Sequence, residues 1–247
     1  GEYAYVTTSP IIINDLDEGN YTITLQLVDM DENPIDPAVV TSVTFSVNLS
    51  GPEFTDIYDI QYTELADGDS PLANQTLWVK GVVSANFNTL VHGEGYYLQQ
   101  GGGEWRGIYV EDFVNSPEIG DSVILRGTVK ENFDMTLLEN ISNYSVFAIG
   151  GVVAEPTVIT TLQASSEEAY ESVLVKVTNA ECVSIGNYGE WNVDDGSGEA
   201  ICKDNGAFAF TPVVGVTYDV TGVIFYGYGN YSIHFRIPSD IVADMSI

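Results

Sequence analysis

Hydrophobic and polar residues alternate in short runs along much of the chain, and Gly, Asn, Asp and Pro separate these runs. Alternation over about four to eight residues is the pattern of a half-buried β-strand. Residues 21–28 alternate in this way, with Tyr21, Ile23, Leu25 and Leu27 on one face, and residues 41–47 repeat the pattern. The segment between them contains Pro34 and several acidic residues, which favour a turn. The pattern therefore predicts an all-β protein.

One set of predicted strands occurs twice, about a hundred residues apart. The first set covers residues 77–83, 95–99, 105–110 and 119–129, and the second covers 173–177, 189–194, 200–203 and 214–223. Such a repeat predicts two units of similar architecture. Each unit is about ninety residues long and has a short connection between its third and fourth strands, as in the five-stranded OB-fold barrel. Short helices are expected before each first strand, at residues 61–66 and 161–170.

These patterns divide the chain into four parts. Residues 1–50 hold about four strands, whereas an immunoglobulin-like sandwich needs about seven, so we expect a partial immunoglobulin-like β-sandwich there. Residues 51–59 are expected to be a linker, residues 60–149 the first OB-like barrel and residues 156–247 the second. The predicted fold class is a partial immunoglobulin-like sandwich followed by two tandem OB-like five-stranded barrels.

The chain is strongly acidic. It has 36 Asp and Glu and 7 Lys and Arg, which gives a formal net charge of −29 at pH 7. The acids are spread over the whole chain. A field of this sign repels phosphate backbones and disfavours nucleic acid as a partner. We expect mainly a surface suited to salty or calcium-rich surroundings. No cofactor is expected, although some carboxylates are candidates for calcium binding.

Two acidic segments are the weak calcium candidates. Asp29 and Asp31 have the spacing of a calcium loop, but Pro34 replaces the required glycine, so a hairpin turn is favoured. Asp194 and Asp195 are the second pair, and a turn between the second and third strands of the repeat is again favoured. Cys182 and Cys202 are the only cysteines, and the sequence is compatible with one disulfide or with two buried thiols.

Residues 57–63 and 68–76, together with 95–99, 107–110 and 119–123, resemble an OB-like module of secreted proteins from Bacteroidota, which often stands beside an extracellular endonuclease/exonuclease/phosphatase-type domain. The resemblance covers residues 57–149 well and 156–247 more loosely. Residues 27–29 and 33–37 are similar to an immunoglobulin-like module of the same proteins. The resemblance implies an exported, extracellular or cell-surface location and neighbouring domains in a longer chain. It implies no active site, since nothing here matches that catalytic domain.

OB-folds bind ligands on their second and third strands and on the loops between strands 1–2 and 4–5. Aromatic side chains there can stack on sugars or bases, and the alternative is that Trp105 and Trp191 close the barrel ends or the contact between barrels. Arg106, Arg126 and Lys130 are candidates for phosphate contacts. The candidate ligand-binding residues are Phe87, His92, Tyr96, Trp105, Arg106, Phe133, Tyr188, Trp191, Tyr226, Tyr228 and Tyr231.

No catalytic motif is present in the sequence. There is no Gly-x-Ser-x-Gly elbow, no His-Glu-x-x-His and no phosphate-cradling loop, and His92 and His234 fall in different predicted barrels. We therefore expect a non-catalytic binding or spacer region whose loop aromatics contact a glycan or a protein, without membrane insertion. Two alternatives remain open: an accessory region that presents nucleic acid to an extracellular nuclease, and a structural subunit of a surface assembly.

Overall fold

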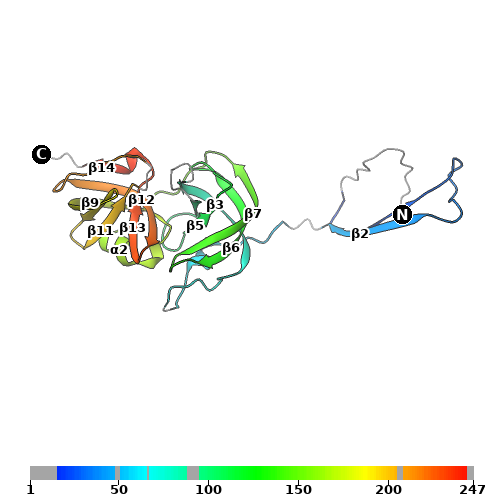
Figure 1. Ribbon diagram of the computed structural model, residues 1–247, viewed down its shortest axis with the longest axis horizontal. Helices are drawn as coiled ribbons and strands as arrows, with labels where there is room; N and C mark the ends of the chain where they lie inside the picture. Colours follow the sequence, from blue (N-terminus) through cyan, green and yellow to red (C-terminus); the bar gives the residue numbers. More distant parts are fainter. Residues whose placement is uncertain (1–15, 48–50, 66, 88–94, 205–207, 244–247) are drawn as a thin grey trace. The chain divides into compact units, whose positions relative to one another are not determined.

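The computed structural model describes residues 16–47, 51–65, 67–87, 95–204 and 208–243 and is all-β (Figure 1). The chain divides into two compact units, Gly1–Glu53 and Phe54–Ile247. Within the described part of the chain, no helix has the length and apolar composition needed to cross a lipid bilayer.

The first unit contains an antiparallel pair of strands, β1 (Gly19–Gln26) and β2 (Val40–Val47). Tyr21 pairs with Phe45 across the strands, and their rings stack with centroids 5.9 Å apart. Leu25 and Val43 on the same two strands stay exposed. The described residues thus hold a two-stranded sheet, which is fewer strands than a sandwich requires.

The second unit begins with a closed five-stranded barrel in the order β3-β4-β5-β7-β6. All neighbouring strands are antiparallel except β5 and β7, which are parallel. The elements are α1 (Ile57–Gln61), β3 (Thr76–Asn86), β4 (Gly95–Gln99), β5 (Gly107–Glu111), β6 (Ser122–Glu131) and β7 (Thr136–Ala148).

Helix α1 lies earlier in the chain than expected. The expected helix was residues 61–66, whereas α1 ends at Gln61. Ile57 and Ile60, three residues apart, are both fully buried in the core of the barrel, and this burial places the helix. The expected linker is also shorter than residues 51–59, because Phe54 already forms a β-bridge with Trp78 of β3.

The rest of the second unit repeats the strand pairing of the barrel. β9 pairs with β10, β10 with β11, β11 with β13 in parallel, β13 with β12, and β12 returns to β9. The elements are β8 (Thr157–Val158), α2 (Thr161–Ser166), β9 (Leu174–Ile185), β10 (Glu190–Asp194), β11 (Glu199–Lys203), β12 (Thr217–Gly227), β13 (Asn230–His234) and β14 (Ile241–Ala243), with 3-10 turns at Glu168–Tyr170 and Pro238–Asp240. We call these residues, 156–243, the second half.

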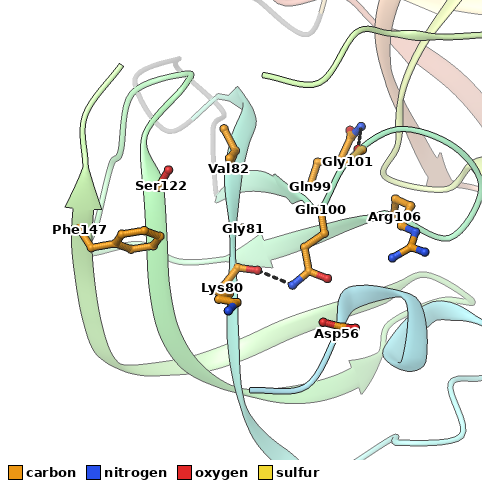
Figure 2. A pocket seen from close by; sticks show the side chains of 10 residues that line it. All are labelled: Asp56, Lys80, Gly81, Val82, Gln99, Gln100, Gly101, Arg106, Ser122 and Phe147. Carbon is orange, nitrogen blue, oxygen red and sulfur yellow. Dashed lines mark hydrogen bonds between the residues drawn. The ribbon is translucent and has the colours of Figure 1, made fainter. Parts of the chain in front are cut away.

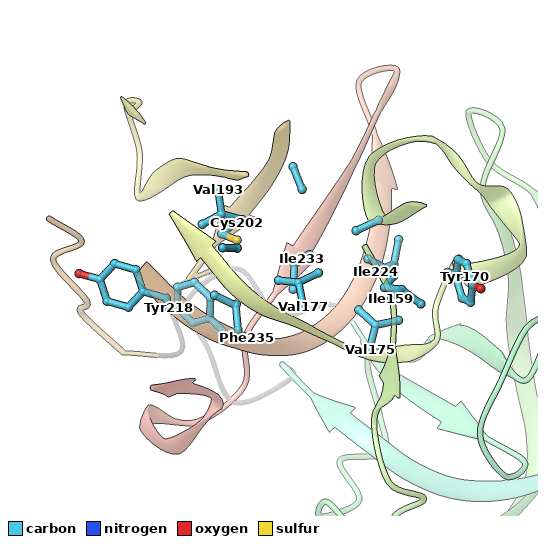
Figure 3. Packing of buried hydrophobic residues seen from close by; sticks show 14 of the residues in the cluster. Ile159, Tyr170, Val175, Val177, Val193, Cys202, Tyr218, Ile224, Ile233 and Phe235 are labelled. Atoms are coloured by element: carbon cyan, nitrogen blue, oxygen red, sulfur yellow. The ribbon is translucent and has the colours of Figure 1, made fainter. Parts of the chain in front are cut away.

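The second half encloses its own hydrophobic core, in which Val175, Val193 and Ile233 point inward from three different strands (Figure 3). Cys182 and Cys202 are fully buried in this core as free thiols. Because β10 lies between β9 and β11, the two cysteine backbones are separated by two strand spacings, roughly 9–10 Å. This exceeds the reach of a disulfide, so the alternative of two buried thiols is the one found.

The barrel and the second half are joined by a third hydrophobic cluster, which we call the junction. Phe87, Tyr97 and Met135 of the barrel pack there against Leu174 and Val223 of the second half. Hydrogen bonds cross the junction from Leu174 N to Gln99 Oε1 at 2.9 Å, from Thr136 N to Glu171 Oε1 at 3.0 Å and from Arg236 Nη1 to the Ser84 carbonyl at 2.7 Å. At Gly107 any β-carbon would overlap the Ser172 carbonyl, so only glycine fits this approach.

Candidate functional site

The hairpin between the fourth and fifth strands is built alike in both halves of the second unit. In the barrel, Asn132 and Met135 exchange two backbone hydrogen bonds, which leaves Phe133 and Asp134 as a two-residue turn. In the second half, Gly227 pairs with Asn230 and leaves the turn to Tyr228 and Gly229. All four turn residues have positive φ, from 53° to 79°. Two-residue hairpin turns with both φ values positive are type I′ turns, which favour Asn-Gly.

An aromatic residue therefore stands at the first turn position in both hairpins, where the backbone favours Asn or Gly. For a side chain with a β-carbon the left-handed conformation costs about 1–2 kcal/mol. Phe133 is 86% exposed and Tyr228 is 101% exposed, so neither ring is buried by the described residues. Backbone strain and an exposed ring thus occur together at equivalent positions.

Two further candidate aromatics also have positive φ. Tyr188, in the loop between β9 and β10, has φ of 57° and is 92% exposed. Trp105, in the loop before β5, has φ of 62°, and its backbone N donates to the Ala169 carbonyl across the junction at 2.7 Å. Loops and turns therefore present Phe133, Tyr188 and Tyr228 to solvent, while Trp105 is partly buried at the contact between the halves.

Arg106 lies at one end of a series of aromatic contacts. Its Cζ lies 5.0 Å from the centre of the Tyr58 ring, and Tyr58 stacks on Tyr62 with centroids 5.3 Å apart. Tyr62 in turn meets the Trp105 ring edge-on at 5.7 Å. A guanidinium over an aromatic face is attracted by the ring quadrupole, so helix α1 and its C-terminal neighbour hold this side chain in place.

Arg106 also lines a hollow on the outside of the barrel, with a volume of about 360 Å³ (Figure 2). Lys80 of β3 lines the same hollow, and its Nζ lies 4.9 Å from the centre of the Phe54 ring. The same hollow is also lined by Asp56, Gln100, Ser122 and Phe147. No sequence motif marks Lys80; its one signal is the alternation of Val79 and Val83 inward with Lys80 outward.

Four of the seven basic residues form ion pairs. These pairs are Lys130 with Glu139, Lys176 with Asp219, Lys203 with Glu190 and Arg236 with Asp240. Among the described residues, Lys80, Arg106 and Arg126 have no carboxylate partner. Lys130, expected as a phosphate contact, is therefore engaged, since its Nζ lies 2.6 Å from Glu139 Oε2.

The remaining candidate ligand residues are in the interior or at the junction. Tyr96 and Trp191 belong to the two cores and are 0% and 1% exposed, so they offer no surface to a ligand. Phe87 is buried in the junction, where Tyr226 also packs. The Tyr226 and Tyr231 rings are in contact at 4.6 Å. His92 lies outside the described residues.

The acidic candidates serve as turn-forming residues. Asp29 Oδ1 accepts hydrogen bonds from the backbone N of Asp31 and of Asn33, both at 2.9 Å. Asp194 Oδ1 accepts from Gly196 N at 2.7 Å, and Asp195 Oδ1 accepts from Ser197 N at 3.0 Å. These are the Asx-type contacts of a tight turn. In the described ranges no three His, Cys, Asp or Glu side chains gather in a way that would hold a metal ion.

One serine–histidine pair is present but buried. Ser232 Oγ lies 3.0 Å from His234 Nε2, and the His234 ring stacks on Phe225 with centroids 4.8 Å apart. Burial, helped by Lys203, lowers the pKa of His234 to about 3, so the imidazole is neutral. His234 is 4% exposed, and the pair belongs to the packing of the junction, where Phe87 also contacts it.

Comparisons with known proteins add little. No family model and no curated protein matches the chain. A solved structure described as "Structural mimicry for functional antagonism" is similar over 70% of this chain and 93% of its own, at 11% identity and a TM-score of 0.30. A similarity of this level carries no argument about fold or function.

Proposed function

We propose that this chain is a non-catalytic binding and spacer region of an exported, cell-surface or extracellular protein, and that its turn aromatics contact a glycan or a protein. One observation carries the proposal: both halves of the second unit place an exposed aromatic at the first position of an equivalent I′ turn. Strained backbone positions are enriched at functional sites. Neither ring is buried by the described residues, so contact with a ligand or partner accounts for the aromatic residue there.

The proposal includes the architecture that the repeat predicted. The two halves are OB-like barrels, supported by their shared order of strand pairing with one parallel pair between the third and fifth strands. The loops that present Phe133, Tyr188 and Tyr228 are then the loops that OB-folds use for ligands. The first unit is part of an immunoglobulin-like sandwich, supported by its alternating strands with exposed Leu25 and Val43.

The test is a titration of the whole chain with soluble oligosaccharides, first the neutral disaccharide lactose and then longer chains, followed by calorimetry. We expect Phe133→Asn and Tyr228→Asn to weaken binding at least about fivefold each, because loss of a stacked ring removes about 1–3 kcal/mol. Asparagine suits the turn, so the backbone of both variants is preserved.

Phe113→Asn is the matched control, since Phe113 is 72% exposed but does not occupy a type I′ turn. It should bind as the wild type does. Unchanged affinity in both turn variants would show that these aromatic side chains do not contact the ligand. Salt-dependent binding of a single-stranded oligonucleotide instead of any saccharide would favour the nuclease-accessory alternative.

A further inference from the structure

Three cations, Lys80, Arg106 and Arg126, have no carboxylate partner among the described residues, in a chain with 36 acidic residues and only 7 Lys and Arg. Lys80 and Arg106 line one hollow. Arg126 lies opposite Trp78 on the neighbouring strand, while Lys80 lies opposite Ile124, so Lys80 and Arg126 are diagonal neighbours on the outer face. Like charges on adjacent strands repel. Among the described residues, none of these three cations forms an ion pair with a carboxylate.

The heads of two of these cations are held in place by rings. Phe54 lies beside Lys80 Nζ and Tyr58 beside Arg106 Cζ, at 4.9 and 5.0 Å from the ring centres. Phe54 is itself fixed edge-on against Trp78 at 6.4 Å. Cations held in this way lose less freedom when a ligand arrives, which favours binding.

The walls of the hollow are suited to a small polar ring. A volume of about 360 Å³ is at the lower end for small-molecule sites. The Ser122 hydroxyl and the 57% exposed Phe147 ring line its other side (Figure 2). Asp56 is the one acid of the lining, so the two cations leave an excess of positive charge. The Gln100 amide is already engaged, because its Nε2 donates to the Lys80 carbonyl at 2.8 Å.

From these features we infer that the hollow between Lys80 and Arg106 is a binding site for a single acidic sugar, whose carboxylate or sulfate group lies between the two cations. This inference rests on the proposed glycan-binding function and adds to the turn aromatics a second contact site with its own ligand class. The anionic group accepts charge-assisted hydrogen bonds from the ammonium and the guanidinium, and the sugar ring lies against Phe147. A glycan with one isolated acidic sugar is favoured over a polyanion, because the net charge of −29 repels a long chain of like charges.

The experiment compares lactose, 3′-sialyllactose and lactose 3′-sulfate in titrations of the full chain, together with a short oligothymidine. We expect 3′-sialyllactose, lactose 3′-sulfate or both to bind at least about tenfold more tightly than lactose at low salt. Lys80→Gln and Arg106→Gln should each remove most of this advantage. The two acidic probes distinguish a carboxylate from a sulfate ligand.

Lys176→Gln is the matched control, because it removes the same charge from an ion pair in the second half. It should keep the full preference for the acidic probe, and Lys80→Arg should retain most of it. If lactose and its acidic forms bind equally, and Tyr228→Asn but not Lys80→Gln weakens them, the inference fails while the proposed function stands. If no saccharide binds, or only oligothymidine does, the inference is overturned together with the glycan-binding part of the proposed function, and a protein is left as the ligand to test.

Discussion

At the scale of single residues, the most unusual group is the carboxyl of Glu171. It is buried in the junction, where Oε1 accepts the hydrogen bond from Thr136 N and Oε2 has no hydrogen-bond partner in the part of the chain that the structure describes. Burial raises the pKa of Glu171 well above its ordinary value, and the nearby carboxylates of Glu168 and Glu131 raise it further. Tyr97 and Tyr231 also face this group, and no cation is among the charges acting on it.

This raised pKa makes the stability depend on pH. The folded chain holds the proton more tightly than the unfolded chain, so the stabilisation is fully present below the ordinary glutamate pKa and is lost as pH rises through the raised value. We expect the free energy of unfolding of the wild type to fall, relative to Glu171→Gln, by on the order of 1–3 kcal/mol between about pH 5 and about pH 8. Urea denaturation of the wild type and of Glu171→Gln at both pH values measures this difference in the free energy of unfolding.

Glu167→Gln provides the control for this prediction, because Glu167 is exposed on the same short segment. It should follow the wild type at both pH values. If Glu171→Gln and the wild type lose stability in parallel, the carboxyl is not the group that titrates.

At the scale of elements, the strands of the repeat were largely predictable, and the fifth strands were not. Alternation located the first four strands of each half to within a few residues, except that β9 extends to Ile185 instead of residue 177. In β7 the register shifts repeatedly against β6, and Asn140 and Asn143 have positive φ. Such bulges break the period of two, which explains why no pattern marked this strand.

The turn between β12 and β13 provides the prediction at this scale. Tyr228→Asn should raise the free energy of unfolding by about 1 kcal/mol, because asparagine tolerates the positive φ that strains tyrosine. The same substitution is expected to weaken ligand binding, so stability and binding change in opposite directions. Thermal unfolding of the wild type, of Tyr228→Asn and of the control Phe113→Asn measures the effect. The control should leave the free energy of unfolding nearly unchanged. A destabilised Tyr228→Asn would mean that the tyrosine ring packs within the chain.

At the scale of the whole molecule, the junction connects the two halves of the second unit by direct packing as well as by the chain between them. Its hydrophobic cluster and its hydrogen bonds join the two halves, and residues 54–247 form one compact unit. Surfaces on the two halves are therefore held at a set geometry. Phe133 and Tyr228, one from each half, both belong to this unit.

We expect the second unit to unfold cooperatively, with amides in β3 and β9 exchanging through the same global opening. Leu174→Ala removes a buried junction side chain and should lower the free energy of unfolding by about 2–5 kcal/mol. In this variant we expect the amides of the two halves to exchange through independent openings. Leu125→Ala, in the core of the barrel, should destabilise comparably without separating them. Hydrogen exchange followed by mass spectrometry distinguishes the two. Independent opening of the halves in the wild type would contradict the coupling.

The sequence by itself determined the all-β class, the repeat and most strands, because alternation, turn residues and duplication are local signals. It also placed Phe133, Tyr188 and Tyr228 among the candidates, since aromatics in turns are visible without a fold. Only the tertiary structure decided that Tyr96 and Trp191 are core residues, that Cys182 and Cys202 are free thiols, and that Lys80 and Arg106 line the same hollow. Burial and charge pairing depend on which strands lie side by side, and residues far apart in the chain become neighbours only when the barrel closes.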